Sequence, residues 1–281
     1  MNLRKFIISS FYIPFRFYNF LLYLLKGKQA RLRILLMHDV PERDYENFQK
    51  KLEYLSLRWN FISTQDLEEH FSGNKCLQGN NLLLSFDDGF YSNRIVAENI
   101  LNPLGIKALF FVVSNFVSLK HPKEQIKFIK NNLYPTWRDH DYPENIDTMS
   151  SMSHDDLRYL TSCGHTIGCH TESHLNLSTI SDDSELISEI IESGNKLEAI
   201  IDAPVEHFSF GFGNVSFFSE KALEIARQRF KFIHTGMRGD NAKNVSSWAL
   251  RRDTIALGDS NFQMSSFLEG SADFRYKQDF E

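Results

Sequence analysis

The fold is indicated most clearly by one short segment, Leu82-Leu83-Leu84-Ser85-Phe86-Asp87-Asp88-Gly89. Its first five residues are typical of a buried β-strand, and the strand gives way at once to two carboxylates and a glycine. Two adjacent carboxylates repel each other, so one of them resists ionisation or both need a cation nearby. An Asp-Asp-Gly sequence on its own is also typical of a turn or a helix N-cap.

A second polar segment, His170-Thr171-Glu172-Ser173-His174, follows another expected strand at 166–169. If this segment is helical or forms a single turn, its two imidazoles lie on one face and can bind the same ion. A histidine pair with this spacing also occurs by chance. The two segments together are therefore more informative than either one alone.

Short apolar runs alternate with stretches of helical period from Leu32 onward, which predicts repeated β-α units in one large domain. The expected strands lie at 32–37, 82–86, 108–113, 166–169, 207–210, 230–234 and near 248–251. The expected helices lie at 45–57, 64–71, 92–102, 123–132, 153–162, 181–201 and 217–228. Loops that follow parallel strands gather at one end of a sheet or barrel, so the carboxylates and imidazoles can meet although about 80 residues separate them.

Such a meeting places two imidazoles and one carboxylate around a divalent ion and leaves one position open to water. This arrangement is typical of a catalytic zinc site, where the ion lowers the pKa of its water from about 15.7 to about 7. The second carboxylate is then free to accept a proton. The residues alone therefore predict hydrolysis of an amide or an ester.

The two polar segments also resemble motifs of a known family, the polysaccharide deacetylases with a NodB-homology domain. Ser85-Phe86-Asp87-Asp88-Gly89 resembles the first motif, and Gly168-Cys169-His170-Thr171-Glu172-Ser173-His174 resembles the second. The resemblance extends over about 32–253 and implies an α/β fold, a distorted (β/α) barrel of about seven strands. It also implies that the protein removes acetyl groups from N-acetylated sugars, with Asp87 as the catalytic base and Asp88, His170 and His174 as metal ligands.

The third motif departs from the family pattern. Its segment, Phe208-Ser209-Phe210-Gly211-Phe212-Gly213, keeps an aromatic-glycine pair but lacks the arginine that would orient the base. Arg251 or Arg252 together with Asp253 could supply that cation, although a surface ion pair is the simpler explanation.

The late Leu-x-His motif, which supplies the general acid in many members of the family, is absent. We expect His38, at the end of the first strand, to replace it, with His234 as the second candidate. A structural histidine is the alternative for both. These departures leave two further hypotheses open: a glycan-binding pseudoenzyme without turnover, and a deacylase of another amide or ester on a sugar.

The composition limits the partners. The chain has 281 residues, with 31 Lys and Arg against 36 Asp and Glu, so its net charge of −5 argues against nucleic acid. The three cysteines, Cys76, Cys163 and Cys169, lack a paired spacing and are expected to be reduced. Cys169 is interpreted as a buried strand end rather than a nucleophile.

An N-terminal segment at 1–31 precedes the expected barrel at 32–281. Its run at 6–25 is apolar and aromatic, contains Pro14 and Arg16, and is flanked by basic residues. It fits neither a cleaved signal peptide nor a spanning helix, which leaves an interfacial helix or a helix packed on the domain. We therefore expect a cytoplasmic protein, with peripheral contact at the inner face of the membrane through residues 1–31 as one of the two options.

A long insertion near 116–151 is rich in aromatic residues, among them Tyr134, Trp137 and Tyr142, and we expect a binding loop or a plain surface loop there. Phe90, Phe210 or Phe212 could stack on a sugar ring. The function expected overall is metal-dependent removal of an N-acyl group, acetyl above all, from an amino sugar in a cell-envelope glycan or a lipid-linked precursor. Zinc is the expected ion, with cobalt, nickel or iron as alternatives.

Overall fold

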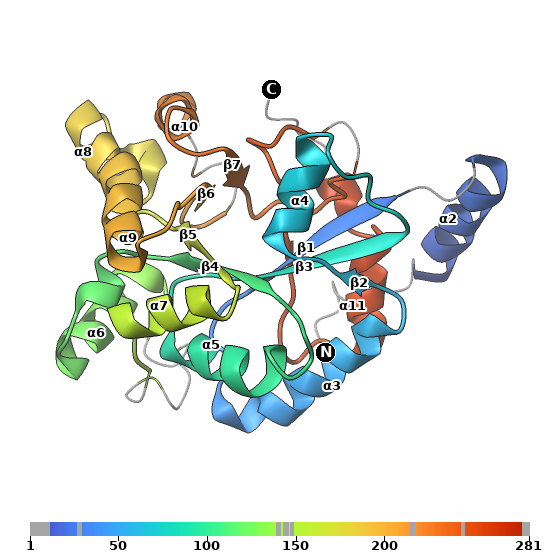
Figure 1. Cartoon of the computed structure of the whole chain (residues 1–281), viewed down its shortest axis with the longest axis horizontal. Coiled ribbons are helices and arrows are strands. Elements are labelled where there is room, and N and C mark those ends of the chain that lie inside the picture. The colour runs from blue at the N-terminus through green and yellow to red at the C-terminus, as the bar shows by residue number, and fades with distance from the viewer. Residues whose placement is uncertain are drawn as a thin grey trace.

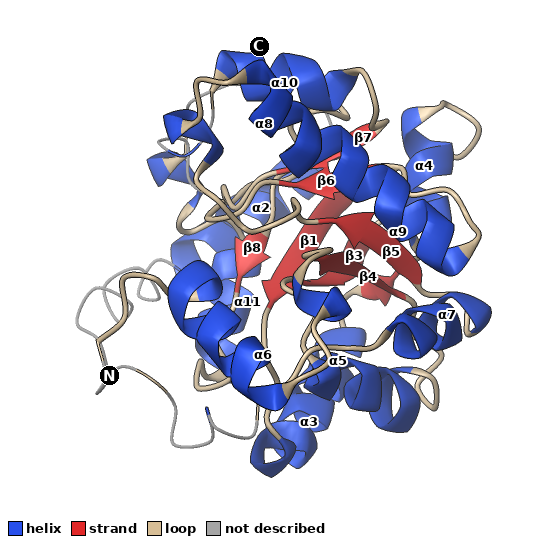
Figure 2. Ribbon diagram, turned by 90° about the vertical axis from the view of Figure 1, so that its left-hand side faces the viewer, coloured by secondary structure: helices blue, strands red, loops and turns tan. Residues whose placement is uncertain are grey.

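The computed structural model describes residues 12–26, 30–138, 142, 146, 149–213, 217, 219–242 and 245–276. A parallel β-sheet lies at the centre of this part of the chain, and helices surround it (Figure 1, Figure 2). Its strands are β1 (Arg31–Met37), β2 (Asn60–Phe61), β3 (Asn80–Phe86), β4 (Ala108–Val112), β5 (Thr166–Cys169), β6 (His207–Ser209), β7 (Phe232–His234) and β8 (Asp253–Thr254). Seven strands follow the order β7-β6-β5-β4-β3-β1-β8, β2 pairs with β3 beside this path, and all these pairs are parallel. The expected distorted (β/α) barrel is confirmed.

The helices alternate with the strands as the sequence predicts. They are α2 (Tyr12–Lys26), α3 (Tyr45–Ser56), α4 (Thr64–Phe71), α5 (Tyr91–Val96), α6 (Pro122–Phe128), α7 (His154–Ser162), α8 (Asp183–Ile187), α9 (Ser193–Ile201), α10 (Glu220–Arg227) and α11 (Asn261–Leu268). Three of the expected helices contain a π-helical turn, at 97–101, 129–133 and 188–192. Strand β2 and helix α11 were not predicted from the sequence.

The last expected strand, near 248–251, is wrong. Within this segment Leu250 forms a single bridge to His234 of β7, and the strand itself comes later, where Asp253 pairs with Leu35 of β1. Because the chain changes its partner from β7 to β1 over so few residues, neither pairing extends. The segment thereby links the two edges of the sheet, and Arg252 lies between them.

Side chains on β1 and β3 alternate between two faces, as the pleat of a strand requires. Leu82, Leu84 and Phe86 belong to the large core beneath the surrounding helices, whereas Leu83 belongs to a smaller cluster that also contains Leu32. By the same alternation, residues 85 and 87 share the face of Leu83. This face leads to the carboxyl ends of the strands, where Asp87 lines a cavity.

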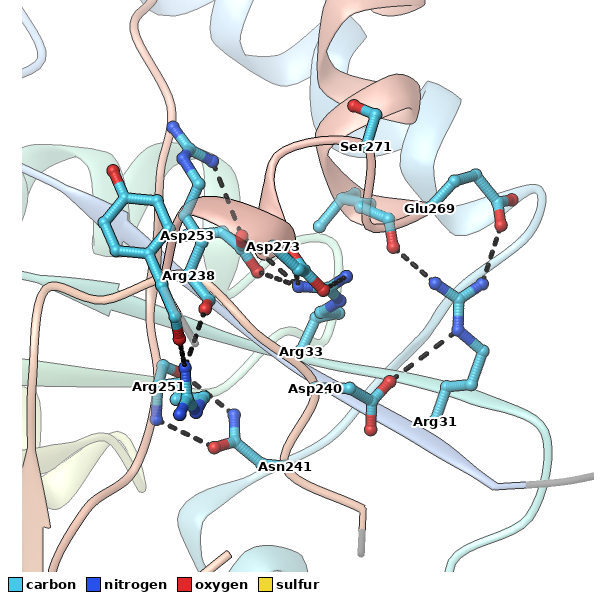
Figure 3. A network of polar contacts seen from close by, with 12 residues as sticks. Arg31, Arg33, Arg238, Asp240, Asn241, Arg251, Asp253, Glu269, Ser271 and Asp273 are labelled. Atoms are coloured by element: carbon cyan, nitrogen blue, oxygen red, sulfur yellow. Dashed lines mark hydrogen bonds and ion pairs between the residues drawn. The ribbon is translucent and has the colours of Figure 1, made fainter. Parts of the chain in front are cut away.

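A network of ion pairs ties the C-terminal part of the chain to β1 (Figure 3). The buried guanidinium of Arg33 contacts Asp253 at 3.2 Å and Asp273 at 2.7 Å. Arg31 contacts Glu269 at 2.9 Å, so a second arginine of the same strand holds the residues that follow α11. The network fixes β8, and with it Arg252, against β1.

Helix α2 stands beside the barrel and contacts it through its first turn (Figure 1). The Tyr12 ring is buried against Phe262 of α11, with ring centroids 5.0 Å apart, and its hydroxyl accepts a hydrogen bond from Arg58 at 2.8 Å. Tyr12 thus packs on the protein, as the option of a helix packed on the domain requires, whereas Tyr18 is exposed. None of the helices in the described residues has the length and apolarity needed to cross a bilayer.

Candidate active site

Asp87 and Asp88 reach the same cavity because strand β3 ends at Phe86, directly before them. In an extended strand, neighbouring side chains point to opposite faces. Asp88 instead has a φ of +77°, in the left-handed region, and this turn brings its carboxylate to the cavity that Asp87 also lines. Gly89 continues the turn with a φ of +93°. The strand end therefore presents two carboxylates side by side.

The two imidazoles meet in an irregular turn rather than a helix. His170 directly follows β5, and its ring centroid lies 5.1 Å from that of His174. Thr171 and His174 have φ values of +66° and +57°, which turn the chain back on itself. Apart from Asp202, the non-glycine residues with positive φ in the described chain are these two, Asp88 and Phe212, all at this site. Strained backbone of this kind concentrates at functional sites.

Asp88, His170 and His174 form a set of metal-ligating atoms that all lie within 4.8 Å of one another. Oδ1 of Asp88 is 3.6 Å from Nε2 of His170 and 3.7 Å from Nε2 of His174. Two ligands held about 2.0–2.1 Å from one tetrahedral ion are about 3.3 Å apart, so the spacing fits a zinc-like ion with little movement. The arrangement agrees with the ligand set expected from the sequence.

The hydrogen bonds that His170 and His174 form through Nδ1 leave Nε2 of each ring available to bind an ion. Nδ1 of His170 donates to the carbonyl of Ser209 at 2.9 Å, and Nδ1 of His174 donates to the carbonyl of Asn132 at 2.9 Å. Because a carbonyl can only accept, the proton of each neutral ring lies on Nδ1, and the lone pair of Nε2 points to the cluster. Neither carbonyl could be predicted from the sequence, since every residue type carries the same backbone acceptor.

The electrostatics of the cluster favour a bound cation. Burial and the adjacent charge of Asp87 raise the pKa of the Asp88 carboxyl well above its usual value. Burial, and secondarily His170, lower the pKa of His174 to about 3, so its ring is neutral at pH 7. A positive ion would stabilise the ionised form of Asp88, and neutral imidazoles are the form that binds metals.

Asp87 has a different partner. Nη1 of Arg252 donates to its Oδ1 at 2.5 Å and Nη2 donates to its Oδ2 at 3.0 Å. Burial on its own would raise the pKa of Asp87, but the Arg252 charge and then His170 outweigh it, so the pKa lies below its usual value. The surface ion pair considered for Arg252 is wrong because both side chains are buried. Arg251 instead binds the backbone of Arg238 and Tyr276.

A cavity of about 480 Å³ opens above these side chains. It is lined by Leu36, His38, Asp87, Asp88, Leu133, Tyr134, Trp137, His170, His174, Phe212, Gly213, Gly236, Thr254 and Tyr276. Of the phenylalanines expected near a sugar, Phe212 lines the cavity, whereas Phe90 and Phe210 are buried in the core. The volume of the cavity and its mixture of aromatic and polar lining residues suit a small-molecule or glycan ligand.

The sequence profile of the polysaccharide deacetylases matches residues 74–229, more than half of the chain. The chain belongs to the polysaccharide deacetylase family. YxkH of Bacillus subtilis (strain 168), whose name places it among the polysaccharide deacetylases, is 21% identical over 254 residues, covering 86% of this chain and 77% of YxkH.

Three solved structures, two of which have a deacetylase in their titles, share the fold. IcaB from Ammonifex degensii superposes with a TM-score of 0.64 at 18% identity, covering 86% of this chain and 100% of IcaB. The deacetylase PplD of Streptococcus pyogenes, solved with acetate, has a TM-score of 0.65 at 16% identity, covering 85% and 98% of the two chains. A de-N-acetylase from Aggregatibacter actinomycetemcomitans gives 0.63 at 17% identity, covering 84% and 99%.

Within the polysaccharide deacetylase family, the altered third motif of this chain still contributes to the site. Ser209 accepts from His170 through its carbonyl, and its hydroxyl accepts from Nη2 of Arg252 at 2.6 Å. Gly211 lies so close to His174 that a Cβ there would be 3.1 Å from the imidazole Cδ2. Phe212 packs on the same ring at 4.5 Å. The third motif therefore holds the two imidazoles and Arg252 in place, and Arg252 supplies the positive charge beside Asp87.

The two candidates for a general acid occupy different places. His38 follows β1 and lines the cavity together with Asp87. Partial desolvation in the cavity lowers the pKa of His38 below its usual value, Arg252 acts in the same direction, and Asp87 opposes both. His234 is fully buried and its Nε2 lies 3.0 Å from Nδ1 of His207, outside the cavity lining. The position of His234 is that of a structural histidine.

Proposed function

We propose that this protein is a hydrolase that removes the acetyl group from an N-acetylated amino sugar, with a divalent metal ion at Asp88, His170 and His174. One observation carries the proposal: three ligand atoms of the zinc-binding type converge beside an ionised, arginine-paired Asp87 at the floor of a cavity. Membership of the polysaccharide deacetylase family supports the same reaction class.

Each side chain of the site has a distinct task in this proposal. When bound, a zinc ion would polarise the acetyl carbonyl and lower the pKa of a water molecule. Asp87 accepts a proton from the attacking water, and Arg252 keeps the carboxylate ionised and fixes its orientation. The protonated form of His38, which the neighbouring Asp87 carboxylate stabilises, donates its proton to the sugar nitrogen as the carbon–nitrogen bond breaks, so the products are acetate and a free amine. Cobalt, nickel and iron are the alternative ions for the same donor set.

The substrate we propose is a cell-envelope glycan or its lipid-linked precursor, and one feature supports contact with a lipid surface. Ile13, Phe17 and Leu21 are exposed and lie at a spacing of four residues along one side of α2. Apolar side chains beside flanking basic residues are typical of helices that bind anionic membranes. Sedimentation with phosphatidylglycerol vesicles tests this contact: Phe17→Ser should reduce binding, and equal sedimentation of both proteins would contradict it.

Release of acetate from N-acetylglucosamine oligosaccharides tests the reaction itself. The parent protein with added zinc should release acetate. Its product should be lighter by one C₂H₂O unit for each acetyl group removed. Asp87→Asn should bind the sugar and release almost none. Binding without release by the parent protein would favour the pseudoenzyme, and loss of a different acyl mass would identify another deacylase.

A further inference from the structure

An aromatic stack runs from the core of the protein to the rim of the cavity. The Tyr134 ring lies between Phe90, at a centroid distance of 6.4 Å, and Trp137, at 4.1 Å. The planes of the two pairs differ by only 15° and 9°, so the three rings are nearly parallel. Phe90 is 1% exposed and Trp137 is 40% exposed. The stack thus presents an outer indole that is supported from behind.

The stack is fixed relative to the metal-ligating residues. Its two outer rings, Tyr134 and Trp137, lie on the segment that follows α6, and Asn132 in this segment accepts a hydrogen bond from Nδ1 of His174 through its carbonyl. The side chain of Asn132 donates to the carbonyl of Ser173 at 2.8 Å. Since Leu133 and Tyr134 line the cavity directly after Asn132, the aromatic wall and the His174 loop are held as one unit.

The cavity offers different chemistry along its walls. The Trp137 indole, stacked on Tyr134, supplies apolar aromatic surface, whereas Thr254 and Tyr276, whose side chains carry hydroxyl groups, belong to the same lining. A pyranose ring has an apolar face of C–H groups and an edge of hydroxyls, so it matches such a combination. A pre-stacked indole also loses little conformational entropy when a ligand covers it.

We propose that Trp137 is the platform on which a pyranose ring of the substrate stacks while the acetamido group reaches the floor of the cavity. This inference rests on the proposed function, because it names the residue of the same site that would hold the sugar ring. Trp137 is accordingly a substrate-binding residue, and its removal should weaken sugar binding rather than metal binding.

The test measures sugar binding without turnover, by calorimetry of the Asp87→Asn protein with N-acetylglucosamine tetramer. Trp137→Ala in this background should raise Kd about tenfold or more, the range for a buried tryptophan anchor. Trp137→Phe should retain most of the affinity because it keeps an aromatic face. Trp248→Ala is the matched control, since Trp248 is 39% exposed but does not line the cavity, and its Kd should equal that of the parent.

Two further readouts separate a binding role from a structural one. The zinc content and the urea midpoint of Trp137→Ala should equal those of the parent, while Kd changes. Equal Kd values for Trp137→Ala and Trp248→Ala, or no measurable binding of the tetramer by the parent, would overturn the inference. Binding that depends on Trp137 in a protein that never releases acetate would support the sugar platform and contradict the proposed reaction.

Discussion

The guanidinium of Arg252 donates a hydrogen bond to each oxygen of the Asp87 carboxylate, from Nη1 to Oδ1 at 2.5 Å and from Nη2 to Oδ2 at 3.0 Å. The two residues are 165 positions apart in the sequence, and they meet because Arg252 lies where the chain passes from β7 to β1. Nε of Arg252 donates to the carbonyl of Thr235 at 3.1 Å, and its planar group packs over the Phe111 ring at 4.8 Å. A guanidinium held in this way can fix the orientation of a catalytic base.

Replacement of Arg252 should separate charge from geometry. Arg252→Lys keeps a positive charge but cannot form the paired hydrogen bonds, and Arg252→Met removes both. We expect kcat to fall about tenfold for the lysine variant and about a hundredfold for the methionine variant, which corresponds to about 1.4 and 2.7 kcal/mol. Acetate release at saturating substrate measures both values.

The pH dependence of the rate should shift in a defined direction when Arg252 is replaced. Arg252 lowers the pKa of Asp87, so its removal should raise this pKa, and the acidic limb of the rate profile should move to higher pH. Arg158→Met is the control, because Arg158 pairs with Asp155 on the surface of α7. An unchanged acidic limb in Arg252→Met would contradict the assignment of Asp87 as the base.

His38 should be required for the chemical step. In His38→Gln the leaving amine lacks its proton donor, so we expect kcat to fall by a factor of about 10² to 10⁴ while zinc content stays the same. His234→Asn is the comparison: since His234 is buried beside His207, its replacement should lower stability without changing kcat of the folded protein. Equal kcat loss in both variants would leave His38 no special role.

Acid should destabilise the fold through His165. This ring accepts from the Ala108 amide at 3.1 Å and lies 3.2 Å from Oδ1 of Asn102, and burial, with a smaller effect of Lys107, lowers its pKa to about 4. The unfolded chain, with a His pKa of about 6.5, binds more protons between pH 4 and pH 6.5. The contribution of His165 to the free energy of unfolding is therefore fully present above pH 6.5 and is lost as the pH falls towards 4.

Urea unfolding at pH 7 and pH 5 measures this effect. The contribution of His165 to the loss between these values should be about 1 to 2 kcal/mol. His165→Asn keeps an acceptor for the Ala108 amide but has no titrating ring, so its stability should depend less on pH. Identical pH dependence in the two proteins would show that the folded-state pKa of His165 is not depressed.

The buried ion pairs of β1 should matter more than those on the surface. Arg33→Met leaves Asp253 buried with Arg238, at 3.4 Å, as its one remaining ion-pair partner in the described part of the chain, so we expect a loss of about 3 kcal/mol in the free energy of unfolding. Lys50→Met removes an exposed pair with Glu46 on α3 and should have little effect. Equal urea midpoints for the two variants would contradict the importance of the network in Figure 3.

Much of the fold follows from local sequence, and the limits of prediction are physical. The runs at β3 and β5 are apolar enough to be recognised as strands, and the polar residues after them must meet at one edge of a parallel sheet. Strand β8 escaped prediction because its position depends on a change of partner, which a hydrophobic pattern does not encode. The two-residue strand β2 is too short to show any period.

The meeting of the candidate ligands was predictable from the sequence, whereas the groups that support them were less so. Asp88, His170 and His174 carry donor atoms that are visible in the sequence. Arg252 was one of two adjacent arginines, and only the tertiary structure separates the one that faces Asp87 from the one that binds Tyr276. The carbonyls of Asn132 and Ser209 were invisible, because every residue has one and only the backbone path decides which faces an imidazole.

The central claim, that a metal ion held by Asp88, His170 and His174 serves sugar deacetylation, is tested most directly by removing and restoring the ion. Acetate release from N-acetylglucosamine oligosaccharides should disappear after dialysis against a chelator and return when one equivalent of Zn²⁺ is added. His174→Ala should bind less than one equivalent and remain inactive after the same addition. Acetate release at an undiminished rate by the metal-free protein would contradict the claim.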